Sequence, residues 1–203
     1  MSFALSFLGE MIPFMLLALP FYLGVRALLL KRRKTRPDWR REALLLAFFL
    51  YCVGLASQTV VPQMGRDADG SLVIFTVFTN NPHFPSVGGL SPWRFNLIPF
   101  HTIKIYLERA HIAVFLVNIV GNILMFAPIG LCVPLLWRRM RGFFRITLLG
   151  IAVSCGIELL QVLMLRSVDI DDVILNSLGV LIGYLLYLPV VKLSTAMRKK
   201  EQF

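Results

Sequence analysis

Acid and amide side chains are concentrated where two apolar stretches meet, in the last third of the chain. They are Glu158, Gln161, Asp169, Asp171, Asp172 and Asn176. Carboxylates at such a place can exchange protons as general acids or bases, and carboxylates together with amides can bind a polar ligand. Which chemistry is available depends on whether the junction lies in a soluble core, at a membrane surface or inside a membrane.

Composition indicates a membrane protein. The 203 residues are 57% hydrophobic and only 16% charged, and their mean hydropathy is +0.74, whereas soluble domains are about one-quarter charged. A helix of about 20 apolar residues crosses the hydrocarbon layer of a bilayer. Five stretches meet or approach this length and predict an all-α integral membrane protein, a bundle of about five transmembrane helices: residues 4–30, 42–61, 112–136, 143–165 and 170–191. Glu10, Pro13 and Pro20 interrupt the first stretch, so whether it spans fully is left open.

Basic residues indicate the orientation, because lysine and arginine are retained on the cytoplasmic side of a membrane. Residues 31–41, 138–145 and 192–203 carry 15 of the 21 lysine and arginine residues. With five crossings, all three segments are cytoplasmic when the N-terminus is outside and the C-terminus is cytoplasmic. The net charge of +10 is therefore assigned to topology and anionic lipid, and no nucleic-acid partner is expected.

These features divide the chain into three parts. Residues 1–41 are expected to form a transmembrane anchor and a basic cytoplasmic loop, residues 42–192 a membrane domain, and residues 193–203 a basic cytoplasmic tail. Residues 62–111 form a long extracellular loop in this interpretation, and whether it acts as a lid is open. Within it, "SLVIFTVFT" favours an extended segment, and a short helix is expected after Pro99.

Helical periodicity brings several polar side chains to one depth. Asn118 and Asn122 are one turn apart on the third apolar stretch. Asp169, Asp172 and Asn176 follow spacings of three and four, which places them on one face at the start of the fifth stretch. The sequence therefore predicts that these side chains converge inside the bundle.

Glu158 is the strongest single candidate for a functional role. It lies about 10 Å below the outer end of the fourth apolar stretch, at 1.5 Å per residue. A carboxylate that faces lipid at this depth is costly, so Glu158 is expected to face the bundle interior or a water-filled cavity. Its candidate partners are Arg166, Asn118 and Asn122.

Simpler interpretations of the same residues stay open. Asn118 and Asn122 could form interhelical hydrogen bonds and nothing more. Asp171 is explained by the favourable interaction of a negative charge with a helix N-terminus. His83, His101 and His111 lack ligand spacing, so no metal site is predicted.

Four segments stand out in order along the chain: "WRFNLIPF" at 93–100, "NIVGNILMFAPIG" at 118–130, "IELLQ" at 157–161 and "RSVDIDDVILNSLGVLIG" at 166–183. Together they resemble the signature segments of the VanZ-like family, which is named for a protein that raises teicoplanin resistance. The residues that match the family's recurring pattern are Arg94, Asn96, Pro99, Phe100, Asn118, Gly121, Asn122, Phe126, Pro128, Gly130, Glu158, Gln161, Arg166, Asp169, Asp172, Asn176, Gly179 and Gly183. The resemblance implies a bacterial cell-membrane protein that influences glycopeptide or lipoglycopeptide susceptibility, and it implies no mechanism.

A binding function is the first hypothesis. A polar cavity open to the outer leaflet would receive a lipid-linked cell-wall precursor or a lipid-tailed lipoglycopeptide, with the two arginines recognising phosphate or carboxylate. Membrane lipids are the other expected partners. The expected ligand-binding residues are Arg94, Asn96, Asn118, Asn122, Glu158, Gln161, Arg166, Asp169, Asp172 and Asn176.

Two other classes of function are alternatives. In an enzyme that modifies a lipid-linked envelope precursor, Glu158, Asp169 and Asp172 would be the catalytic candidates, with Glu158 as general acid or base. In a transporter, Glu158 would couple proton movement, although the chain has no apparent internal repeat. The sequence determines neither a cofactor nor the oligomeric state.

Overall fold

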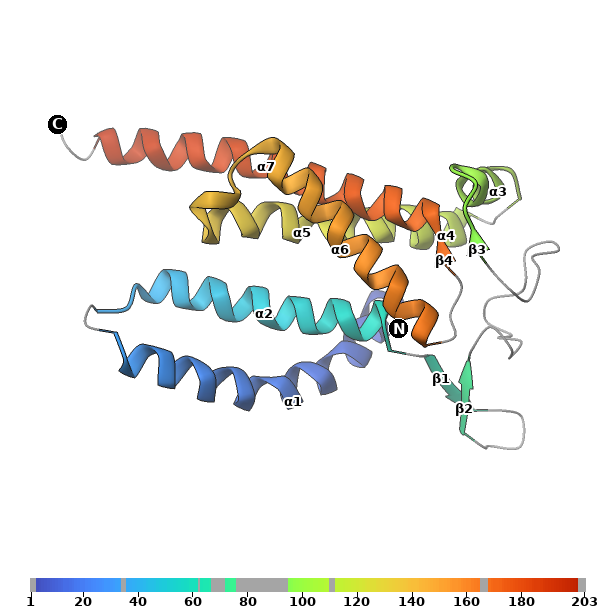
Figure 1. The fold of residues 1–203 in the computed structure, drawn as a ribbon, viewed down its shortest axis with the longest axis horizontal. Helices are drawn as coiled ribbons and strands as arrows, with labels where there is room; N and C mark the ends of the chain where they lie inside the picture. Colours follow the sequence, from blue (N-terminus) through green and yellow to red (C-terminus); the bar gives the residue numbers. More distant parts are fainter. Residues whose placement is uncertain are drawn as a thin grey trace. The chain divides into compact units, whose positions relative to one another are not determined.

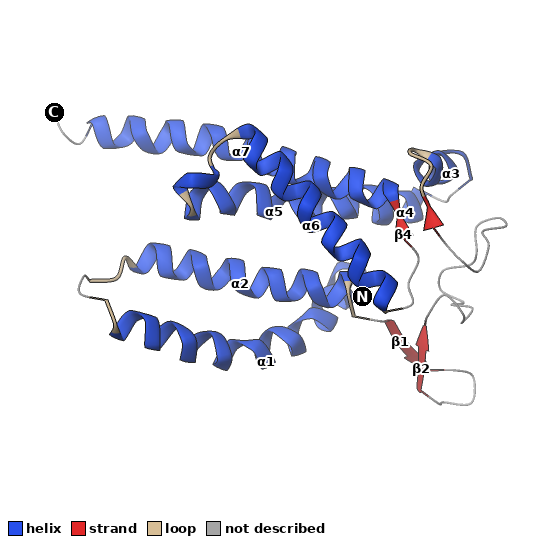
Figure 2. Cartoon of the chain, viewed as in Figure 1, coloured by secondary structure: helices blue, strands red, loops and turns tan. Residues whose placement is uncertain are grey.

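The computed structural model describes residues 3–33, 36–61, 63–66, 72–75, 95–109, 112–164 and 168–200. The chain forms two compact units, Met1–Val61 and Pro62–Phe203. Each unit is built mainly from long helices, and short strand pairs occur in the second (Figures 1 and 2).

The first unit is a pair of helices, α1 (Phe3–Lys31) and α2 (Trp39–Thr59). Asp38 is the N-cap of α2, where its side chain accepts hydrogen bonds from the backbone N–H groups of Arg40 and Arg41. Such a cap satisfies donors that a helix start leaves unpaired. The start of α2 is therefore specified locally.

An ion pair joins the two helices of the first unit. The Arg26 guanidinium donates to both carboxylate oxygens of Glu42, with a distance of 2.7 Å from Nη2 to Oε1. Arg33 Nη1 lies 3.8 Å from Oε1 of the same carboxylate. Glu42 is buried, and a bidentate guanidinium partner offsets the cost of burying its charge. This contact explains an arginine within the first apolar stretch.

The second unit contains three long helices and several short elements. The short elements are β1 (Gln63–Arg66), β2 (Leu72–Phe75), β3 (Phe95–Asn96), α3 (His101–Arg109), α4 (Ile112–Phe115), the π-helix η1 (Leu116–Val120), the 3₁₀ helix η2 (Arg138–Met140) and β4 (Val168–Asp169). The long helices are α5 (Gly121–Leu136), α6 (Phe143–Leu163) and α7 (Ile170–Lys200). Strands β1 and β2 pair antiparallel, and β3 and β4 pair parallel. Helix α7 packs against both α5 and α6, whereas α5 and α6 touch little.

Glycines allow α5 and α7 to approach with their backbones in contact. A Cβ added at Gly179 would collide with the Ile123 carbonyl oxygen, and one added at Gly183 would collide with the Ala127 carbonyl oxygen. Gly130 of α5 lies equally close to the backbone of Val180. Small residues at helix interfaces permit this packing in lipid.

The long helices confirm the predicted spans. Among the described residues, five helical segments are long and apolar enough to cross a membrane, at Gly9–Lys31, Trp39–Thr59, Leu116–Leu136, Phe143–Leu163 and Ile170–Leu193. The protein is thus a multi-pass membrane protein with a helical fold. The extended segment expected within residues 71–79 is present as β2, and the short helix expected after Pro99 is α3. The orientation of the termini and the three-part division of the chain stay predictions.

Gly183→Ala should destabilise the second unit, because the new Cβ would collide with the Ala127 backbone. We expect the free energy of unfolding in detergent micelles to fall by about 1–3 kcal/mol. The matched control is Gly156→Ala on α6, where an added Cβ meets no atom within 4 Å. That variant should be neutral or more stable by up to about 1 kcal/mol, and equal stability of the two variants would contradict tight α5–α7 packing.

Candidate functional site

The β3–β4 pair brings two distant parts of the chain together at the start of α7. Asn96 of β3 is in register with Asp169 of β4. The Asn96 side chain donates from Nδ2 to Asp169 Oδ1 and to Thr102 Oγ1, at 2.9 Å in each case. The segment before α3 is thereby joined to the segment before α7.

Asp169 is the centre of this contact. Its Oδ1 also accepts from the backbone N–H of Asp171 at 2.9 Å, which caps the N-terminal end of α7. Its Oδ2 accepts from the hydroxyl of Thr102. The carboxylate therefore holds α7 on one side and α3 on the other.

Asp171 fastens the start of α3. Its side chain is only 1% exposed. Its carboxylate accepts from the backbone N–H of Phe100 and, at 3.0 Å, from that of Ile103. Phe100 has a positive φ of 65°, which is unusual for an aromatic residue, and the bond to Asp171 stabilises this turn. The sequence interpretation assigned Asp171 only to the dipole of its own helix, α7. That interpretation was incomplete, because the Asp171 carboxylate also caps the start of α3.

Glu158 and Asn122 add the other two long helices to the cluster. Glu158 of α6 is 5% exposed, and its Oε2 accepts from the backbone N–H of Asp169 at 3.1 Å. Asn122 of α5 donates from Nδ2 to Asp172 Oδ1 of α7 at 3.0 Å. The predicted convergence of α5, α6 and α7 on one polar site is thus present in the geometry.

A second polar contact lies one turn further along α7. Asn176 donates from Nδ2 to the hydroxyl of Ser154 on α6 at 2.9 Å, and both residues are buried. Beyond it the seam becomes apolar, since Val180 packs 3.1 Å from the position of a Cβ on Gly150. Polar side chains therefore extend from the start of α7 only part of the way along the α6–α7 seam.

Tyr106 of α3 also belongs to this environment. Burial raises the pKa of its phenol, and the negative charges of Asp172 and Asp169 raise it further. Burial likewise raises the pKa of Asp169, against the opposing effect of hydrogen bonds from Thr102, the Asp171 backbone and Asn96. Both groups are thereby favoured in their protonated forms.

Together, these residues are called the polar cluster: Asn96, Thr102, Tyr106, Asn122, Ser154, Glu158, Asp169, Asp171, Asp172 and Asn176. Gln161 is buried on α6, and Asn118 is half-buried in η1. π-Helical turns often occur at functional sites. Arg94, Arg166, His83 and His111 lie outside the described residues. In the part of the chain that the structure describes, no group of three or more His, Cys, Asp or Glu side chains could hold a metal ion.

Sequence reasoning missed four members of the polar cluster. Asp171 was assigned only to the helix dipole, and Thr102, Tyr106 and Ser154 were not among the predicted site residues. Ser154 follows Gly150 and precedes Glu158 at intervals of four residues. That spacing, which puts all three on one helix face, could have identified it.

Comparison with known proteins identifies one family. A model described as VanZ/LLP1 matches residues 70–192, well over half of the chain. This range contains all the residues of the polar cluster. No curated protein and no solved structure matches the chain significantly.

Asp169 should make stability depend on pH. Its pKa is raised in the folded protein, so the folded state binds more protons than the unfolded state between the two pKa values. The free energy of unfolding should therefore increase as pH falls from neutral through the folded pKa, and decrease as pH rises through it. Asp169→Asn should remove this component, measured as the difference between wild-type and variant unfolding midpoints across pH.

The control for this measurement is Glu108→Gln, which removes an exposed carboxylate of α3. Its profile should run parallel to that of the wild type. A difference between wild type and Asp169→Asn that is constant with pH would refute the raised pKa of Asp169.

Proposed function

The chain belongs to the VanZ/LLP1 family, and from this premise we propose that it influences teicoplanin and lipoglycopeptide susceptibility by binding a lipid-linked or lipid-tailed ligand. The site is the polar cluster. The observation that carries the proposal is a set of three contacts between segments. Asp169 accepts from the side-chain amide of Asn96 in β3, Asp172 accepts from that of Asn122 in α5, and Glu158 of α6 accepts from the backbone N–H of Asp169. Ionisable side chains within membrane-spanning helices are costly, and they commonly mark functional sites.

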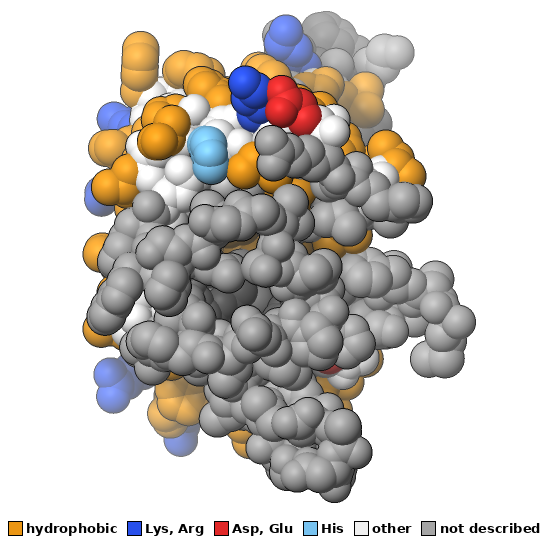
Figure 3. All heavy atoms as spheres, turned by 90° about the vertical axis from the view of Figure 1, so that its right-hand side faces the viewer, with side chains coloured by type: hydrophobic (Ala, Val, Ile, Leu, Met, Phe, Trp, Pro, Cys, Tyr) orange, Lys and Arg blue, Asp and Glu red, His pale blue; other side chains and the backbone are white. Residues whose placement is uncertain are grey.

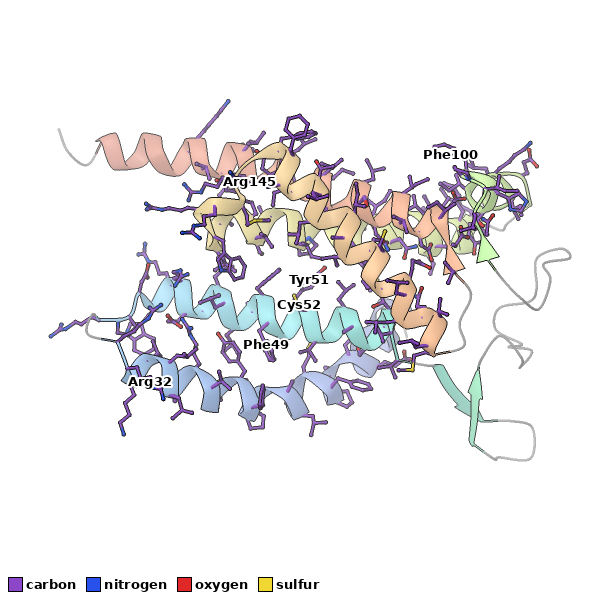
Figure 4. The ribbon with its side chains drawn as sticks, viewed as in Figure 1. Arg32, Phe49, Tyr51, Cys52, Phe100 and Arg145 are labelled. Atoms are coloured by element: carbon purple, nitrogen blue, oxygen red, sulfur yellow. The ribbon has the colours of Figure 1, made fainter. Side chains whose placement is uncertain are left out.

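The proposed orientation places the polar cluster at the outer face of a bacterial cell membrane. The basic residues of the α5–α6 connection support this orientation. Tyr184, which lies well beyond the polar cluster along α7, donates to the Arg141 carbonyl at 2.8 Å, so the connection lies away from the polar cluster. Phe100, next to the polar cluster, lies far from Arg145 along the length of α6 and α7 (Figure 4). With arginine held in the cytoplasm, the polar cluster faces outward, where glycopeptides act.

The two arginines expected from the sequence remain part of the proposal. Arg94 precedes Asn96 by two residues, and Arg166 precedes Asp169 by three. Their sequence neighbours Asn96 and Asp169 are hydrogen-bonded to each other. The guanidinium groups of Arg94 and Arg166 would suit recognition of phosphate or carboxylate on the ligand.

An enzyme acting on a lipid-linked envelope precursor is the second candidate. The raised pKa of Asp169 favours it, since a carboxyl that stays protonated nearer to neutral pH is suited to general acid catalysis. Glu158 or Asp172 would then be the base. Against this role, Asp169 accepts three hydrogen bonds that hold the fold together, so binding remains the favoured function.

Susceptibility of a sensitive bacterial host tests the proposal. The host would express the wild type, Glu158→Gln, Asp172→Asn or Arg94→Ala at matched membrane levels. Loss of one hydrogen bond to a charged group should weaken ligand binding on the order of ten- to a hundredfold, which should abolish most of the effect on teicoplanin susceptibility.

Glu108→Gln is the matched control for the carboxylate variants, because it has the same chemistry on the exposed face of α3. It should behave as the wild type. Full function in all three site variants would refute the site. Turnover of a lipid-linked precursor by the purified wild type, lost in Asp169→Asn, would replace binding by catalysis.

A further inference from the structure

Four large apolar side chains are exposed beside the polar cluster. Leu97, Ile98, Phe100 and Leu107 have exposed fractions between 61% and 67%, and they are called the apolar rim. Leu107 lies on α3, and Phe100 immediately precedes this helix. All four lie outside the segments that are long enough to span a membrane. Exposed apolar groups that lie together mark a surface that contacts protein or lipid.

The polar cluster fixes the outward direction of the apolar rim. The buried Asp171 carboxylate holds the backbone of Phe100 and Ile103, and Thr102 contacts Asp169. These bonds occupy the inward side of the turn and of α3. The apolar side chains of the rim are consequently held on the opposite, exposed side.

The same bonds set the level of the apolar rim relative to the membrane. Asp171 is in the first turn of α7, and the span that contains it begins at Ile170. Since Phe100 and Ile103 bond directly to Asp171, the rim lies level with the end of a spanning helix. Ile112 and Leu116, where the next span begins, are also exposed apolar residues. The rim is therefore continuous along the chain with a lipid-facing surface.

Charged residues beside the rim are typical of an interfacial helix. Lys104 and Glu108 are 72% and 53% exposed, with 3.8 Å between Nζ and Oε1. Hydrophobic side chains appear at the surface of this end, around a basic and an acidic side chain that lie together (Figure 3). A lysine at this position can extend to the headgroups while apolar neighbours enter the acyl region.

We propose that Leu97, Ile98, Phe100 and Leu107 insert among the acyl chains of the leaflet that borders the polar cluster. The element from Leu97 to Leu107 is then an interfacial anchor, held rigidly by Asp171. Lipid covers the apolar rim. The rim lies level with the end of a spanning helix, and exposed apolar residues occur again where the next span begins. The proposal does not depend on the proposed function.

Spin labels test the depth of the rim in the full-length protein. Single cysteines would replace Ile98, Leu107 and Glu108, in a variant with Cys52, Cys132 and Cys155 removed, reconstituted in phosphatidylglycerol–phosphatidylethanolamine nanodiscs. Accessibility to oxygen and to a water-soluble nickel complex gives the depth of each label. Labels at 98 and 107 should lie about 5–10 Å below the headgroup boundary, and the label at 108 should lie in water or among headgroups.

A reference position in a spanning helix calibrates these labels. Leu148 of α6 is 68% exposed within a span and should report lipid. A high nickel accessibility at 98 and 107 would overturn the proposal by placing the rim in water. Low accessibility to both reagents would also overturn it, because a second copy or another protein would then cover the rim.

A second measurement uses the unmodified protein, so that loss of the native cysteines cannot prevent a result. A lipid-soluble diazirine in liposomes should label the peptide containing Leu97–Leu107 after photolysis, and a water-soluble carbene precursor should label its rim residues several-fold less. The reverse preference would overturn the proposal. Neither outcome depends on teicoplanin susceptibility, so failure here is distinguishable from failure of the proposed function.

Discussion

The structure of the second unit depends on one constraint: carboxylates removed from water need hydrogen-bond donors. An ionised carboxylate away from water is costly unless donors surround it. Glu158 and Asp171, which are buried, and Asp169, which is half-buried, each accept at least one backbone N–H from another segment or from a helix start. Each such bond satisfies an amide that a turn or helix end would leave unpaired. The hydrogen bonds that offset the cost of removing these carboxylates from water therefore also hold the segment around α3 against the ends of the long helices.

The glycine contacts of α5 and α7 provide the frame for these bonds. Gly179 and Gly183 lie on the same helix as Asp172 and Asn176, one to three turns further along. Backbone contact at Gly179 with the carbonyl oxygen of Ile123 puts the neighbouring Asn122 within 3.0 Å of Asp172. Larger residues at the glycines would separate the helices, and the short Asn and Asp side chains could not bridge the gap. Packing inside the bundle and polar geometry at its end are thus coupled.

Much of the fold was predictable from the sequence. Long apolar stretches indicate the helices that cross the membrane, and the fixed helical period indicates which residues share a helix face. The approach of Asn122 and Asp172 is a consequence of that period. The role of Asp171 was not predictable, since its partners are backbone N–H groups of residues 68 and 71 positions away. Every residue except proline has such a group, so no side-chain pattern marks them. The positive φ of Phe100 is equally invisible, because it depends on the same distant carboxylate.

The order of contacts along α6 and α7 bears on mechanism. From the polar cluster inward, Ser154 meets Asn176, then Gly150 meets Val180, and finally Phe143 stacks edge-on against Tyr184. Val180 and Ile146 are fully buried, so apolar side chains fill the middle of this seam. An ion or proton pathway needs polar groups or water through the whole hydrocarbon layer. In the described part of this seam, the polar cluster ends at Asn176 and the contacts of Val180 with Gly150 and of Tyr184 with Phe143 are apolar, which is easier to reconcile with the proposed binding function than with a pathway between these helices.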